Sequence, residues 1–112
     1  MRKATAADEV STQPQQVSAR PLDRDDAERL ARLLKVVSDP TRLQLLSMIS
    51  DSPSGEACVC DLTEPLGLRQ PTVSHHLRMM VDAGILQREK RGIWAWYSIA
   101  PDRLAAIADI LR

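Results

Sequence analysis

Two cysteines separated by a single residue, Cys58 and Cys60, are the side chains of this 112-residue chain best suited to hold a soft ion. Deprotonated thiols bind trivalent arsenic and antimony, and also Pb(II), Cd(II) and Zn(II). In a reducing compartment, a pair at this spacing indicates a ligand or redox pair and not a disulfide that staples the fold. Three interpretations are open: a metal or metalloid site, a switch that works by thiol oxidation, or two small buried apolar side chains.

A second chemical pattern lies in residues 70–83, where apolar side chains recur at helical spacing. The face expected to be buried consists of Val73, His76, Leu77 and Met80. The remaining faces carry polar side chains able to contact DNA: Gln70, Thr72, Ser74, His75 and Arg78. Because Gln pairs with adenine and Ser or Thr tolerates several bases, this helix is expected to read the major groove. An ordinary solvated helix face is the alternative.

The adjacent histidines in this helix do not form a metal site, because neighbouring helical residues point about 100° apart. We expect His76 to be hydrogen-bonded at the edge of the core, and His75 to contact DNA or solvent.

Positive charge is concentrated around the same helix, although the formal net charge of the whole chain is zero. Between residues 69 and 91 the local net charge is +3, from Arg69, Arg78, Arg88, Lys90 and Arg91 against Asp82 and Glu89. Arg88, Lys90 and Arg91 lie close to Gly92 in an expected β-hairpin, where they would meet phosphates or the minor groove. Arg69, just before the helix, is a further expected DNA contact. A soluble turn without a DNA contact is the alternative for the hairpin.

The length of the chain fits one domain. Aromatic residues make up only 3% of the chain, so Leu, Ile, Val, Met and Ala must build its core, which favours helices. Residues 1–20 have a polar composition without apolar periodicity and are expected to be a disordered tail before a domain over 21–112. No apolar run approaches the roughly 20 residues of a membrane span, and no signal peptide is visible. We therefore expect a cytoplasmic protein without a membrane partner.

The elements expected to position these side chains are five helices and a hairpin. The helices are expected over 22–37, 40–50, 58–66, 70–83 and from 101 onward, and the strands over 85–90 and 93–99. Asp39 is a plausible N-cap with Pro40 at the first helical position. A tight connection at 67–69 joins the third and fourth helices into a helix-turn-helix. The fold class is therefore mainly α, a helix-turn-helix followed by a two-stranded β-hairpin wing.

Four segments of this sequence together resemble the ArsR/SmtB family of winged-helix repressors. They are Ser38-Asp39-Pro40-Thr41-Arg42-Leu43, Cys58-Val59-Cys60-Asp61-Leu62, Gln70-Pro71-Thr72-Val73-Ser74-His75-His76-Leu77 and Ala83-Gly84-Ile85-Leu86. The resemblance covers the chain from about Leu22 onward. It implies a repressor that binds double-stranded operator DNA as a homodimer, paired through its first and last helices, and needs no enzymatic activity or organic cofactor.

Apolar stripes on both terminal helices agree with such a homodimer. They consist of Ala27, Leu30, Ala31, Leu34 and Val37 in the first helix, and of Leu104, Ile107, Ala108 and Leu111 in the last. Exposed on a monomer, these stripes would promote aggregation. An isologous dimer would place two recognition helices on a pseudo-palindromic operator.

The resemblance also implies that Cys58 and Cys60 form the site of an arsenic-responsive repressor, which releases DNA when As(III) or Sb(III) binds. Some members have a third cysteine where this chain has Thr63, so the third ligand is left open between an exogenous thiol, hydroxide and water. Members that sense cadmium or lead add cysteines from the N-terminal tail, which has none here. Members that sense zinc use Asp and His of the last helix, which here offers Asp102 and Asp109 but no histidine.

Two other functions are weighed against this one. A redox switch of the same fold would use the same two thiols without a metal. A small dithiol oxidoreductase is disfavoured, because the chain has no C-x-x-C and no βαβ pattern.

The spacing of the cysteines further predicts how binding would reach the DNA. Residues i and i+2 of a helix point about 200° apart, so two thiols in the first helical turn could share an ion only if that turn unwound. The helix start would favour the thiolate, with Glu56 and Asp61 opposing it.

Overall fold

The computed structural model describes residues 21–110, apart from the side chains of Leu104, Ile107 and Ile110. The expected tail over 1–20 lies outside the described residues, as does Leu111 of the predicted stripe on the last helix. Among the described residues, no helix has both the length and the apolar character needed to cross a membrane.

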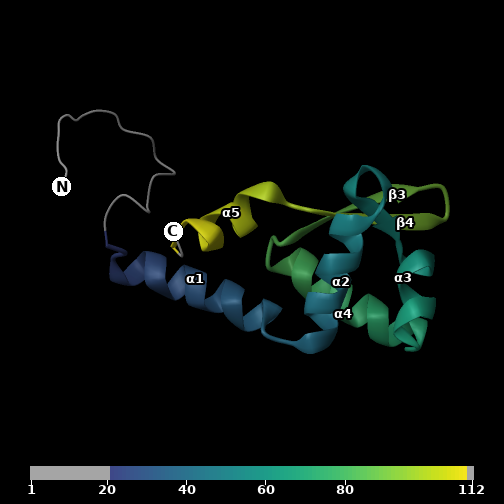
Figure 1. Cartoon of the computed structure of the whole chain (residues 1–112), viewed down its shortest axis with the longest axis horizontal. Helices are drawn as coiled ribbons and strands as arrows, with labels where there is room; N and C mark the ends of the chain where they lie inside the picture. The colour runs from purple at the N-terminus through teal and green to yellow at the C-terminus, as the bar shows by residue number, and fades with distance from the viewer. Residues whose placement is uncertain (1–20, 111–112) are drawn as a thin grey trace.

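Five α-helices are present in the described part of the chain, as expected (Figure 1). They are α1 (Arg24–Val37), α2 (Pro40–Asp51), α3 (Val59–Leu66), α4 (Gln70–Asp82) and α5 (Pro101–Ile110), with a short 3-10 turn, η2 (Pro53–Gly55), after α2. The predicted cap of α2 is confirmed, since the Asp39 carboxylate accepts a hydrogen bond from the backbone N–H of Arg42 at 3.1 Å. Gly67 ends α3 with a left-handed φ of 67°, which allows the short connection to α4.

The wing belongs to a three-stranded antiparallel sheet within residues 21–110. The predicted two-stranded hairpin is present, but the prediction missed the third strand. The strands β2 (Glu56–Cys58), β3 (Leu86–Arg91) and β4 (Trp94–Ile99) lie in the order β2-β4-β3. Cys58, expected to start a helix, instead ends β2 and pairs with Trp96 of β4. The wing turn is also one residue later than expected, because Arg91 still pairs with Trp94 and the turn is Gly92-Ile93.

The core lies between α2, α3, α4 and the sheet. Its fully buried side chains are Leu45, Ile49, Leu62, Val73, Leu77, Met80 and Ile85. The predicted buried face of α4 is therefore confirmed at Val73, Leu77 and Met80. His76 lies half-buried at its edge and accepts a hydrogen bond on Nδ1 from Arg42 Nε at 3.1 Å, as expected.

Helices α1 and α5 contact each other on the side of the molecule away from the wing tip (Figure 1). The stripe predicted on α1 is only partly buried in this chain. The residue that α1 buries is Leu33, which was not in the stripe, whereas Ala31 and Leu34 of the stripe are exposed. Helix α1 thus has two apolar faces, one packed on the core and one left open.

Candidate functional site

The two cysteine sulfurs meet at the junction of β2 and α3. Cys58 is the N-cap of α3 with extended backbone angles, φ −81° and ψ 149°, and its Sγ accepts from the backbone N–H of Cys60 at 3.4 Å. The Sγ atoms of Cys58 and Cys60 are 2.6 Å apart, and both cysteines are free. Cys58 is buried, whereas Cys60 is exposed. The pair therefore presents two converging sulfurs, one of them open to solvent.

This geometry corrects the prediction that the first helical turn must unwind before both thiols can face one ion. That prediction assumed that both cysteines lie within the helix, 200° apart. Because Cys58 precedes the helix and is extended, its side chain already turns toward Cys60. Convergence of the sulfurs therefore needs no loss of helical structure.

The surroundings of Cys60 disfavour its thiolate. The pKa of Cys60 is raised, first by its side-chain hydrogen bond with Cys58, then by partial desolvation and by the charges of Cys58 and Asp61. A backbone hydrogen bond at Asp61 acts in the opposite direction. For Cys60, the expected gain from the helix start is thus outweighed, and a thiophilic ion would have to displace the thiol proton.

The third ligand stays open among the residues that the structure describes. No group of three or more His, Cys, Asp or Glu side chains there could hold a metal ion. Thr63, at the position of a third cysteine in some family members, donates its hydroxyl hydrogen to the carbonyl oxygen of Val59 at 2.7 Å. Its hydroxyl hydrogen is therefore already donated to the backbone of α3.

Most of the predicted base-reading side chains lie on the open surface of α4. Gln70, Thr72, His75 and Arg78 are exposed, as is Arg69 before the helix, and Ser74 is half-buried. His75 and His76 lie with ring centroids 5.9 Å apart at 60° to each other, which is an edge contact and not a shared ligand site.

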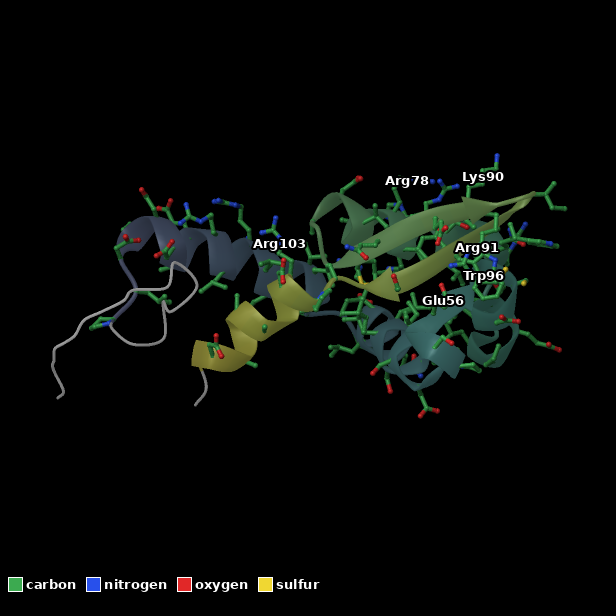
Figure 2. All side chains as sticks on the ribbon, turned by 90° about the horizontal axis from the view of Figure 1, so that it is seen from above. Glu56, Arg78, Lys90, Arg91, Trp96 and Arg103 are labelled. Carbon is green, nitrogen blue, oxygen red and sulfur yellow. The ribbon has the colours of Figure 1, made fainter. Side chains whose placement is uncertain are left out.

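A hollow of about 480 Å³ lies between α4 and the wing. It brings together four of the predicted DNA contacts, Gln70, Ser74 and Arg78 from α4 and Arg88 from β3. Arg69, Thr72, His75, Lys90 and Arg91 do not line it. Because side chains alternate along a strand, Lys90 shares the face of β3 that carries Arg88. Figure 2 shows Lys90 on the same side of the molecule as Arg78.

Arg91 differs from the other wing bases. It lies on the opposite face of β3, and its Nη2 donates to Glu56 Oε1 at 2.6 Å and to Glu89 Oε1 at 2.7 Å. These two hydrogen bonds raise its pKa. Its charge is balanced within the chain by Glu56 and Glu89, a pairing that the hairpin pattern did not indicate.

Two apolar side chains at the wing tip were missed by the sequence reasoning. Ile93 is 83% exposed and Trp94 is 46% exposed, and both line the hollow beside α4. Bulky apolar side chains next to a turn glycine were the available signal, since exposed apolar groups beside bases are used to wedge into the minor groove.

Arg42 ties the helices together behind this surface. Besides His76, its guanidinium donates to the carbonyl oxygen of Val36 at 2.9 Å and to Met79 Sδ at 3.2 Å. One side chain thus links α1, α2 and α4.

Comparison with known proteins agrees with this arrangement. Residues 39–88 match the family described as bacterial regulatory protein, arsR family. An uncharacterised HTH-type transcriptional regulator of Methanocaldococcus jannaschii is 38% identical over 84 residues, covering 75% of this chain and 92% of that protein. The arsenical resistance operon repressor of Staphylococcus aureus is 39% identical over 85 residues, covering 76% of each.

Solved structures give the same result for the fold. The AntR antimony-specific transcriptional repressor has 30% sequence identity and a TM-score of 0.67, covering 89% of both chains. A possible transcriptional regulator for arsenical resistance has 29% identity and a TM-score of 0.64, covering 70% of this chain and 79% of the other.

Proposed function

Because the chain belongs to the ArsR family of bacterial regulatory proteins and is a winged helix-turn-helix transcriptional repressor, not an enzyme, we propose that it releases its operator when As(III) or Sb(III) binds Cys58 and Cys60. The observation that carries the proposal is the convergence of two free sulfurs at the head of the helix-turn-helix, 2.6 Å apart and with Cys60 exposed. The names of similar proteins, which include arsenical resistance operon repressors and an antimony-specific repressor, support this choice of ion.

The residues present fit a soft three-coordinate ion. Two thiols supply soft donors, and the exposed side of Cys60 leaves room for a third ligand from solution, either a small thiol, hydroxide or water. When bound, the ion would link the end of β2 to the first turn of α3. DNA binding and dimerisation depend on the side chains of the protein.

DNA would be read by α4 and gripped by the wing. Gln70, Thr72 and Ser74 would reach base edges, whereas the cationic contacts would hold phosphates. The proposed cationic and imidazole contacts are Arg69, His75, Arg78, Arg88 and Lys90. The hollow between α4 and the wing supports joint binding of DNA by these two elements. Polar and basic side chains from α4 and the basic side chain of Arg88 from the wing line it together.

A homodimer through α1 and α5 is part of the proposal. The open apolar face of α1 supports it, because Leu34 is 44% exposed and Ala31 is exposed beside it. Two recognition helices would then match two half-sites of an operator in the cytoplasm. Sedimentation at micromolar concentration tests this, and a stable monomer would contradict it.

The proposed response is tested by titrating the protein–operator complex anaerobically, in a reducing buffer, with As(III), Sb(III), Cd(II), Pb(II) and Zn(II). Release at the lowest concentration by As(III) or Sb(III) supports the proposal. Release by Cd(II) or Pb(II) at lower concentrations contradicts it and favours a cadmium or lead sensor.

The contact between the two sulfurs also favours one second candidate, a thiol-redox switch. Sulfur atoms this close need little movement to form a covalent bond. The candidate predicts that peroxide releases DNA as arsenite does, and that a reductant restores binding. If arsenite releases DNA under reducing anaerobic conditions and peroxide does not, the redox candidate is excluded.

A further inference from the structure

An ion pair joins the cysteine-bearing strand to the wing. Arg91 of β3 donates from the same nitrogen, Nη2, to Glu56 of β2 at 2.6 Å and to Glu89 of β3 at 2.7 Å. Its guanidinium carbon lies 5.1 Å from the ring centroid of Trp96, within the range of a cation–π contact. Figure 2 shows Glu56, Arg91 and Trp96 together on the side of the wing away from Arg78 and Lys90.

The contact with Glu56 crosses the whole sheet. Strands β2 and β3 are the two edges, with β4 between them, so Arg91 reaches over Trp96 of the central strand to meet Glu56. Trp96 is the pairing partner of Cys58. Because residues two apart on a strand share a face, Glu56 and Cys58 lie on the same face of β2. Cys58, Trp96 and the ion pair therefore lie on one face of the sheet, with Cys58 buried at the end of β2.

We propose that Glu56 is a positioning residue for the wing, which holds Arg91 in place while the cysteine pair is empty and loses this hold when the pair is loaded. The inference rests on the proposed function, since it explains how an ion at Cys58 and Cys60 reaches the DNA-binding surface. It replaces the unwinding of α3, which the position of Cys58 makes unnecessary.

A physical reason for the loss of hold lies in the sulfurs themselves. Two sulfurs that share one ion through metal–sulfur bonds of about 2.3 Å lie farther apart than 2.6 Å at ordinary bond angles. Rotation of the exposed Cys60 side chain can supply part of this separation, whereas Cys58 is buried at the end of β2, so we expect the rest to come from a shift of that strand. Glu56, two residues from Cys58 on the same strand, moves with β2, whereas Arg91 stays with β3.

The pair stabilises the fold little, because both groups are partly exposed to solvent, with side-chain exposures of 41% for Arg91 and 28% for Glu56. Its expected effect is on the position of the wing and not on folding. Substitution of Glu56 should therefore change DNA binding without a matching change in the melting temperature.

The test compares Glu56→Gln with Glu89→Gln in the full chain. Each variant removes one carboxylate that bonds the same nitrogen of Arg91, but only Glu56 connects the wing to β2. Operator Kd is measured with and without arsenite, uptake is measured separately by counting thiols protected from a thiol reagent, and thermal unfolding checks the fold.

Glu56→Gln is expected to weaken operator binding without arsenite toward the affinity of the arsenite-loaded wild type. This sign is informative, because removal of a negative charge alone would strengthen binding to DNA. An ion pair this exposed contributes at most about fivefold to an equilibrium constant, so in Glu56→Gln the ratio of the two Kd values should fall by about two- to fivefold. Glu89→Gln should keep the wild-type ratio.

A wild-type ratio in Glu56→Gln, with both thiols still protected, overturns the inference and leaves the proposed function standing. An equal loss of the ratio in both variants also overturns it, because the effect would then come from the charge near Arg91 and not from the link to β2. If wild-type protein itself takes up no arsenite or keeps its DNA, the proposed function fails instead.

Discussion

The two faces of the wing sheet carry basic residues with different surroundings. On the face toward α4, Arg88 lines the hollow beside Arg78, and Lys90 follows it along the strand. On the other face, Arg91 is held by two carboxylates and lies over Trp96. Residues adjacent in sequence thus belong to different environments, because the alternation of a strand sends them to opposite sides.

This difference indicates that the two faces have different functions. Basic side chains without a carboxylate partner are available to bind DNA phosphates. A basic side chain that already forms an ion pair gains less free energy from a phosphate. The face with Arg91 also holds Cys58, so it is the face on which a bound ion would act. One face is expected to read DNA and the other to sense the ion.

The largest expected effect comes from the cysteines on the sensing face. Cys58→Ser and Cys60→Ser should each abolish release by arsenite and keep operator affinity near that of wild type, because each removes one of two ligands and neither contacts the DNA-reading face. Fluorescence anisotropy of a labelled operator, titrated with arsenite, measures both quantities. Either variant that still releases DNA at the wild-type arsenite concentration breaks the division between the faces.

The next largest effect is expected on the DNA-reading side. Gln70→Ala, and to a lesser degree Ser74→Ala, should cost about 1–3 kcal/mol in preference for the operator over random DNA, as is typical when a base contact is lost. Thiol protection by arsenite should stay unchanged in both. Binding competitions against random DNA at constant salt give the measurement, and an equal loss on both DNAs would remove the residue from base reading.

A smaller effect should distinguish two neighbouring bases of the wing. Arg88→Gln is expected to lower affinity for operator and random DNA alike and to reduce the slope of log K against log salt by about 1 per protomer. Arg91→Gln should reduce this slope less, because Glu56 and Glu89 already balance its charge. This revises the equal role that the hairpin sequence indicated. Equal slopes for the two variants would show that DNA draws Arg91 away from its carboxylates.

Local signals explain what the sequence predicted well. The start of α2 follows from Asp39 and Pro40, the end of α3 from Gly67, and the buried face of α4 from apolar residues at helical spacing. Each of these depends on residues within one or two turns of the chain. The resemblance of four segments to the ArsR/SmtB family added the fold and the importance of the cysteines.

Long-range pairing explains what the sequence did not predict. Strand β2 has three residues and is defined by its pairing with β4. Three residues are too few to show the alternating pattern that would predict a strand. The position of Cys58 before the helix depends on this strand, and the error about helix unwinding followed from it. The contact between Glu56 and Arg91 joins residues 35 apart in sequence, and the burial of Leu33 depends on how α1 meets the core.

The smallest expected effect concerns how strongly the two thiols act as a pair. The first cause of the raised pKa of Cys60 is its hydrogen bond with Cys58, so Cys58→Ser should lower that pKa and increase the thiolate fraction at any pH below it. Alkylation of Cys60 by iodoacetamide near neutral pH should then be faster in this variant, because the thiolate is the reactive form. The gain should vanish at a pH above both pKa values, where Cys60 is ionised in either protein. Mass spectrometry of alkylated Cys60 over time gives the rates, and in wild type the alkylation of buried Cys58 is scored separately. A slower reaction in the variant would mean that Cys58 stabilises the thiolate of Cys60, and the sensing face would then bind its ion through an activated thiolate and not by displacing a proton from a coupled thiol pair.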